Sequence, residues 1–514
     1  MNPIPTHNTK RIAKNTVFLY FRSIVVMLIG IYTSRVVLQS LGVDDYGVYN
    51  VIGGFVAMFS ILSASLVNAS QRFISFEMGK EKPQMSRLFC GTVSIHLLLA
   101  LVVLFLFETF GIWFLNTQLN IAPDRMKAAN WVFQCSVMTF CINLISVPFN
   151  ASIIAHERME VFAYISIYEA AAKLGIVYLL NIIGFDKLIV YAFLMLLVAV
   201  SLQLIYGIYC SRHFAECEFH FVIDKPLFKE MLSFTGWNFI GSAAGILTSQ
   251  GINILINLFF GVALNAARGL AEQVNQAINT FVNNFMTAMN PQITKSYAAG
   301  DFEYMNKLMA QGAKYSALLF WFIALTVFME ADVILQIWLI EVPPYASIFL
   351  RLTILCSVFQ ALSNTLYIGM LATGNIKKYQ IVMGSIYICS FVLCYFLFKL
   401  KFGPEYGYIS TLIALLIALF VRLKLIREIV SDFSVKFFFN QAILKSISVI
   451  LLSTVAVYVI KHFVVFSNQY LELTFVLVLS MSSVAMMTLL IALSKSERDM
   501  LKDQIVMIFN KKNQ

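Results

Sequence analysis

The stretch from Asn265 to Asn290 is too polar for lipid and too regular for a loop. At about 100° of rotation per residue, its polar side chains fall in one stripe about 80° wide. The stripe holds Arg268, Glu272, Asn275, Asn279, Asn283 and Asn290. The opposite face is apolar, so the pattern predicts an amphipathic helix that ends at Pro291. Its length from Arg268 to Asn290 is roughly 33 Å, close to the thickness of a bilayer core.

This stripe needs water or polar partners. Arg268 at the centre of a bilayer would cost about 2.5 to 3.5 kcal/mol on insertion scales. We expect a membrane helix that packs on its neighbours and turns the stripe towards a central aqueous cavity. Two alternatives remain: a helix lying on the membrane surface, or a stripe buried as a hydrogen-bonded seam between helices.

Three arginines are candidates for binding an anion. Arginine binds compact polyanions through forked donors and stays charged at physiological pH. Arg35 and Arg268 are expected in the outer third of the membrane, and the alternative for both is snorkelling to the outer headgroups. Arg22 is balanced between the cavity and the inner headgroups.

Uncharged amides are candidates for binding hydroxyl groups, because Asn and Gln supply a donor and an acceptor together. The candidates are Asn275, Asn279, Asn283, Gln250, Asn253 and Asn257. Structural contacts between helices are an equally good explanation for any one of them. Glu169 and Lys173 are four residues apart on one predicted helix, so an ion pair is the first expectation and proton coupling the second.

Composition places these residues in a membrane protein. The chain has 514 residues, of which 60% are hydrophobic and 12% charged. The net charge of +10 is spread over many short loops, which does not favour nucleic acid as a partner. The polar N-terminus is followed by an apolar run long enough to remain an anchor, so no secretory leader is expected.

Fourteen apolar segments could each cross a bilayer. They are 15–38, 46–70, 88–112, 130–154, 160–182, 187–210, 231–258, 265–290, 313–330, 346–371, 379–398, 406–423, 441–462 and 471–493. Lys and Arg are concentrated in the tails and in the loops after even-numbered segments, which predicts that both termini are cytoplasmic.

Two halves of the chain resemble each other. Leu41–Asn50 and Phe260–Ala271 each follow a first apolar segment, and Ser70–Leu88 has a counterpart in Pro291–Met309. The prediction is an all-α polytopic protein with two six-helix bundles related by a pseudo-two-fold axis along the membrane normal. The expected parts are bundle 1–210, cytoplasmic linker 211–230, bundle 231–430, and 431–514 with two extra helices and a cytoplasmic tail.

Enzyme chemistry is disfavoured. The six histidines show no metal-ligand spacing, no GxSxG nucleophile motif occurs, and the eight cysteines form no CxxC pair. We therefore expect no catalytic residues, no metal site and no cofactor.

A family resemblance lies in Asn15–Gly79, above all in RVVLQSLGVDDYG from Arg35 to Gly47. This segment resembles the opening of polysaccharide repeat-unit (O-antigen) flippases of the Wzx type. These belong to the multidrug/oligosaccharidyl-lipid/polysaccharide (MOP) exporter superfamily. Many members are described with twelve helices, so fourteen is a departure, although lipid II flippases of the same superfamily have fourteen.

The resemblance implies alternating-access transfer of undecaprenyl-pyrophosphate-linked oligosaccharide from the cytoplasmic to the periplasmic leaflet of a bacterial inner membrane, for surface polysaccharide such as lipopolysaccharide. Arg35 and Arg268 would then hold the pyrophosphate and the amides the sugar. Glu272, Glu169 and Lys173 are the coupling candidates, with Na⁺ or a proton as the driving ion. Other polysaccharide-assembly membrane proteins are potential partners. The alternative function is a MATE-like drug or cation exporter; a membrane acyltransferase or polysaccharide polymerase is less favoured.

Overall fold

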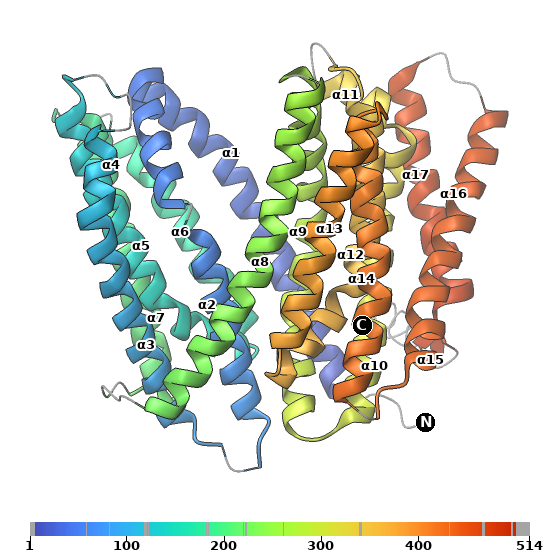
Figure 1. Ribbon diagram of the computed structural model, residues 1–514, viewed down its shortest axis with the longest axis horizontal. Coiled ribbons are helices and arrows are strands. Elements are labelled where there is room, and N and C mark those ends of the chain that lie inside the picture. Colours follow the sequence, from blue (N-terminus) through green and yellow to red (C-terminus); the bar gives the residue numbers. More distant parts are fainter. Residues whose placement is uncertain are drawn as a thin grey trace, which may run out of the picture. The chain divides into compact units, whose positions relative to one another are not determined.

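The computed structural model describes residues 6–57, 59–81, 83–117, 121, 123–180, 182, 184–218, 220, 224–260, 262–338, 342–430, 432–464, 468–494 and 497–499. Some side chains within these ranges, including those of Arg35 and Asn257, are outside the description. Every regular element in these ranges is helical (Figure 1). The chain divides into two compact units, Arg11–Ser242 and Ala243–Gln514 with Met1–Lys10, and each is described by itself below.

The first unit contains the helices numbered from α1 to α7. They are α1 (Thr6–Ala57), α2 (Ser60–Met78), α3 (Met85–Leu106), α4 (Ile112–Thr117), α5 (Met126–Ala155), α6 (Met159–Leu180) and α7 (Lys187–His213). A π-helical turn at Phe107–Gly111 joins α3 to α4, and a short 3-10 turn at Ala215–Cys217 follows α7. Two apolar clusters form its core, one around Phe133 and one around Val177.

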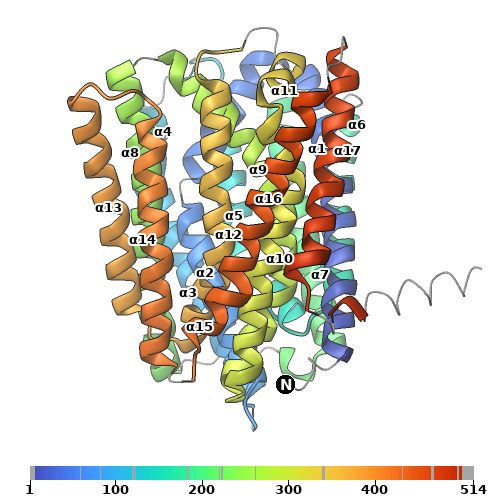
Figure 2. The same cartoon turned by 90° about the vertical axis from the view of Figure 1, so that its right-hand side faces the viewer.

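The division between the units falls inside α8 (Lys225–Phe260). The second unit continues with α9 (Val262–Ala298), α10 (Phe302–Met329), α11 (Ala331–Trp338), α12 (Ala346–Thr373), α13 (Lys377–Lys399), α14 (Tyr406–Ile429), α15 (Val435–Phe438), α16 (Lys445–Phe463) and α17 (Gln469–Met487). A π-helical turn at Phe439–Leu444 precedes α16, and another at Thr488–Ala492 follows α17. α16 and α17 pack together and against α10 (Figure 2).

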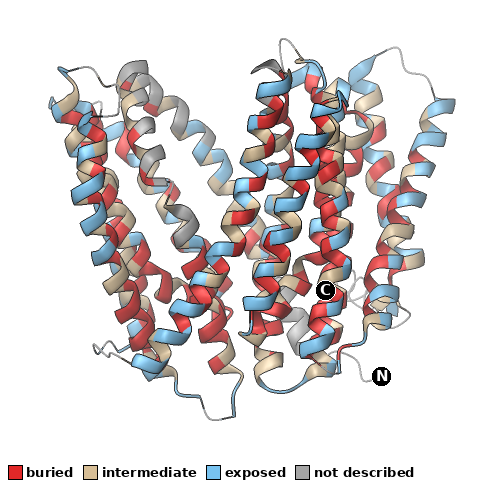
Figure 3. Cartoon of the chain, in the orientation of Figure 1, coloured by how far each residue is buried: buried red, intermediate tan, exposed pale blue. Residues whose placement is uncertain are grey.

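Eleven helices of the described part of the chain are long and apolar enough to cross a membrane. α1, α2 and α9 occupy the remaining predicted segments, and α9 is distinctive because it is polar. Large apolar side chains such as Phe105 and Leu258 are 68% and 73% exposed, as expected for surfaces that face lipid (Figure 3). The prediction of an all-α polytopic membrane protein is confirmed.

Two local predictions are wrong. The break expected between 38 and 46 is absent, since α1 remains helical to Ala57. The sequence between 38 and 46 contains no proline that would remove a helical hydrogen bond.

Pro291 also fails to end its helix, because α9 continues to Ala298. Pro291 lacks the N–H that would donate to the carbonyl of Thr287 four residues earlier, and membrane helices tolerate the loss of such a hydrogen bond. The helix ends instead before Gly300, whose φ of +74° suits a residue without a side chain. Asp301 then caps α10 by accepting a hydrogen bond from Tyr304 N at 3.0 Å.

The linker predicted at 211–230 overlaps α8, which begins at Lys225. The compact units separate later, between Ser242 and Ala243, and residues 431–514 belong to the same unit as the bundle before them. Because α8 runs through the boundary between the two units, no change of amino-acid composition marks that boundary in the sequence.

Candidate functional site

Arg268 on α9 is buried within the second unit, with 8% of its surface exposed. Its Nη2 donates to the carbonyl oxygen of Ser249 on α8 at 3.3 Å, and its guanidinium carbon lies 5.3 Å from the ring centroid of Tyr408 on α14. No carboxylate in the described part of the chain lies within ion-pair distance of this guanidinium. A buried charge requires a partner, so Arg268 retains the capacity to bind an anion.

Glu272 lies one turn beyond Arg268 and is half-buried. It interacts electrostatically with Tyr408 and with Cys356 on α12, as Arg268 does. The two charged residues of the predicted stripe therefore share one environment, formed by α9, α12 and α14.

Asn275 and Asn279 form a polar seam between α9 and α12. The Oδ1 atom of Asn275 accepts a hydrogen bond from Ser357 Oγ at 2.8 Å. The Nδ2 atom of Asn279 donates to the same hydroxyl at 3.3 Å and to the carbonyl of Asn275 at 3.1 Å. At these two positions the structure has the hydrogen-bonded seam that the sequence left as an alternative to the cavity.

A second polar face on α9 is exposed. We call Gln273, Gln276, Thr280 and Asn283 the outward stripe; all four are exposed and fall within about 80° of one another around the helix. Thr280 Oγ1 donates to the carbonyl of Gln276 at 3.0 Å, whereas the three side-chain amides have no hydrogen-bond partner among the described residues. Uncharged amides in a membrane helix require water or a polar ligand.

Of the outward stripe, the sequence analysis identified only Asn283, because the stripe that it predicted was centred on the charged Arg268 and Glu272. The spacing of Gln273, Gln276 and Thr280 was visible in the sequence and carried the missing signal.

The other amide and arginine candidates are placed as follows. Asn253 on α8 is half-buried, and Gln250 is exposed. Arg35 and Asn257 have side chains outside the described residues.

Arg22 lies inside the first unit. Its guanidinium carbon is 4.6 Å from the ring centroid of Phe162 on α6, and it interacts electrostatically with Glu169 and with Tyr206 on α7. The expected ion pair is formed, because Lys173 Nζ lies 2.6 Å from Glu169 Oε1.

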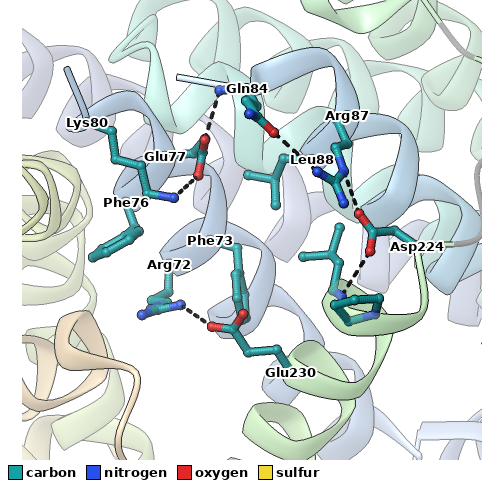
Figure 4. Close-up of a pocket in the computed structure, with 12 residues that line it drawn as sticks. Arg72, Phe73, Phe76, Glu77, Lys80, Gln84, Arg87, Leu88, Asp224 and Glu230 are labelled. Atoms are coloured by element: carbon teal, nitrogen blue, oxygen red, sulfur yellow. Dashed lines mark hydrogen bonds and ion pairs between the residues drawn. The ribbon is translucent and has the colours of Figure 1, made fainter. Parts of the chain in front are cut away.

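A pocket of about 340 Å³ lies where the turn after α2 meets the start of α8, within the first unit (Figure 4). Its charged side chains pair with one another. The contacts are Arg72–Glu230 at 3.6 Å, Lys80–Glu77 at 2.6 Å and Arg87–Asp224 at 2.6 Å. The hydrogen bond from Arg87 holds the pKa of Asp224 below its ordinary value. Because its charges pair with one another, this pocket connects helices and, among the residues described, offers no unpaired charge to a ligand. The sequence analysis did not identify it.

A second set of ion pairs in this unit explains the role of one residue of the RVVLQSLGVDDYG segment, Asp45. Arg125, just before α5, donates from Nε to Asp45 of α1 at 2.8 Å and from Nη1 to Asp186 at 2.8 Å. Asp186 also caps α7 by accepting from Leu188 N at 3.0 Å. Arg125 therefore joins three elements, and Asp45 supplies the contact from α1.

Among the side chains that the structure describes, no group of three His, Cys, Asp or Glu could hold a metal ion, and the cysteines are free. Around α9 the arrangement offers a buried cation, Arg268, and faces of neutral hydrogen-bonding groups inside a membrane helix, which suits binding and passage of a solute.

These features define a helical membrane transporter. The profile of the family described as "Polysaccharide biosynthesis protein" matches residues 12–297, and the MatE profile matches residues 246–396. The chain belongs to the polysaccharide biosynthesis protein family and is a transporter of the MOP superfamily. No curated protein matches the chain.

Solved transporters share the fold. A crystal structure of a MATE transporter has a TM-score of 0.70 at 12% identity, covering 83% of this chain and 97% of that one. A MOP superfamily transporter from Pyrococcus furiosus has a TM-score of 0.67 at 12% identity, with 82% and 96% covered. A mutant MATE transporter of Vibrio cholerae has a TM-score of 0.64 at 16% identity, with 84% and 99% covered. At these identities the likeness establishes the fold alone.

Proposed function

We propose that this protein flips undecaprenyl-pyrophosphate-linked oligosaccharide from the cytoplasmic to the periplasmic leaflet of a bacterial inner membrane by alternating access. The observation that carries the proposal is the combination on α9 of the buried, carboxylate-free Arg268 with the exposed, uncharged outward stripe. The ligand has the matching parts, a compact anion and a hydroxyl-rich glycan.

Arg268 and Arg35 are the proposed pyrophosphate ligands, with Arg22 as a further candidate. Charge-assisted hydrogen bonds contribute about 1.5 to 3 kcal/mol each, which is about ten- to hundredfold in affinity. Asn283 of the outward stripe is the proposed sugar contact on α9, and Asn253 and Asn257 extend the set to α8. Asn275 and Asn279 hold α9 against α12 and would act on the glycan only through that packing.

The test is flipping of lipid-linked oligosaccharide in reconstituted vesicles. Arg268→Ala and Arg35→Ala should each reduce flipping by about ten- to hundredfold at equal protein level. Arg268→Lys should retain part of the activity, since the charge survives and the forked geometry does not. Arg351→Ala is the matched control, because Arg351 pairs with Asp332 through Nη2 at 2.8 Å and should flip normally when changed.

Wild-type flipping by the double alanine variant would contradict the proposal. The second candidate function is a drug or cation exporter, which the MatE match over 246–396 favours. Gradient-driven export of a lipophilic cation that survives both arginine changes would support that function instead.

A further inference from the structure

A cavity of about 230 Å³ lies within the first unit, between α1, α5 and α7. Tyr49 and Gly53 line it from α1, and Ser136, Thr139, Phe140 and Asn143 line it from α5. The α5 residues are spaced three, one and three apart, so they lie on one face of that helix. Asn143 is exposed, which makes the cavity reachable from outside the unit.

The lining is neutral and rich in hydrogen-bonding groups. Among the residues that the structure describes, no Asp, Glu, Lys, Arg or His lines the cavity. The side chains of Ser136, Thr139 and Asn143 have no hydrogen-bond partner among the residues that the structure describes. Elsewhere on the same helix, Ser146 and Ser152 donate to the carbonyls of Ile142 and Pro148 at 3.0 Å each. The cavity therefore concentrates donors and acceptors that a ligand could satisfy.

Two aromatic rings border these polar groups and are held by their neighbours. Tyr49 makes an edge contact with Tyr191 of α7 at a centroid distance of 4.8 Å, and Phe140 makes one with Phe107 at 6.2 Å. A flat ring beside hydroxyl and amide groups suits a ligand with an apolar face and a hydroxylated edge.

Gly53 marks open space. A Cβ built at this position meets no atom within 4 Å, apart from its helix neighbours. A larger side chain here would enter the cavity rather than displace protein atoms.

We propose that this cavity is a subsite for one uncharged, hydroxyl-bearing sugar ring of the transported lipid. The proposal rests on the flippase function and adds a glycan contact in the first unit to the sugar contacts proposed on α8 and α9. The neutral lining excludes a charged sugar, which would lose its hydration without gaining a counter-charge. It disfavours a cationic drug for the same reason.

The experiment compares two probes bound to the full chain in lipid nanodiscs: undecaprenyl pyrophosphate, and undecaprenyl pyrophosphate carrying an uncharged trisaccharide. Wild type should prefer the sugar-bearing probe by about tenfold, since one or two neutral hydrogen bonds contribute that much. Gly53→Leu should remove this preference and leave the affinity for undecaprenyl pyrophosphate unchanged.

Gly30→Leu is the matched control. Gly30 lies on the same helix, and a Cβ there also meets no atom within 4 Å, so the preference should persist. Thr139→Val removes one cavity hydroxyl at nearly constant volume and should weaken the preference without filling the space, which provides a second test if Gly53→Leu folds poorly.

Two outcomes would overturn the subsite: an undiminished preference in both Gly53→Leu and Thr139→Val, or a wild type that does not distinguish the probes. A wild type that binds neither probe would overturn the flippase proposal itself, which separates the two failures.

Discussion

We propose Glu272 as the residue that links transport to an ion gradient. It is half-buried one turn from Arg268, and both act electrostatically on Tyr408 and Cys356. A carboxylate there could exchange a proton or a sodium ion as the anion binds Arg268. Glu272→Gln should therefore abolish the dependence of flipping on an imposed gradient while leaving gradient-independent exchange.

Glu303→Gln is the matched control for Glu272, since Glu303 is an exposed carboxylate on α10 that pairs with Lys307 at 2.7 Å. Its flipping should depend on the gradient as in wild type. If Glu272→Gln also keeps that dependence, Glu272 is a structural neighbour of Arg268, and the Glu169–Lys173 pair becomes the next candidate for coupling.

At the scale of elements, a buried lysine of α10 binds the segment after α17. Lys314 is 3% exposed, and its Nζ lies 3.2 Å from Glu497 Oε1 and 3.1 Å from the carbonyl of Ala492. Tyr315 OH donates to the same carboxylate at 2.7 Å. Burial opposes ionisation of Glu497, but Lys314 and these hydrogen bonds lower its pKa to about 2.

Glu497→Gln leaves the lysine buried without a counter-charge, so it should lower the free energy of unfolding by about 3 to 5 kcal/mol. A carboxyl with a lowered folded-state pKa stabilises the fold above its unfolded value of about 4.3, and this contribution is lost as the pH falls towards 2. The difference between wild type and variant should therefore shrink over that interval. Unfolding in detergent at several pH values measures it.

The exposed pair of Glu303 and Lys307 on the same helix is the control for the contact between Lys314 and Glu497. Glu303→Gln changes a side chain that is 76% exposed and should leave unfolding unaltered. Equal stability of Glu497→Gln and wild type would show that the contact between Lys314 and Glu497 does not stabilise the packing of the C-terminal segment on α10.

At the scale of the molecule, the positive-inside pattern predicts both termini in the cytoplasm. Cys389 is the one exposed cysteine of the eight, so a Cys389→Ser background should react weakly with a membrane-impermeant thiol reagent. In that background, Pro344→Cys should be labelled from outside intact cells, and Glu81→Cys only after the membrane is opened. Both positions are exposed. Labelling of Glu81→Cys in intact cells would reverse the proposed orientation.

The sequence by itself determined the membrane class, most helix positions and the unusual polarity of α9. These follow from local composition and a period of about 3.6 residues, which do not depend on neighbouring elements. The Glu169–Lys173 pair was accessible for the same reason, because its spacing lies within one helix.

Only the tertiary structure decided what each polar face meets. Asn275 and Asn279 became a seam because Ser357 of α12 lies opposite them, and the outward stripe was left exposed on the same helix. The cavity beside Gly53 and the ion pair between Lys314 and Glu497 bring together residues that are far apart in the chain. Periodicity gives the angle of a side chain about its own helix, whereas burial depends on which neighbour packs at that angle.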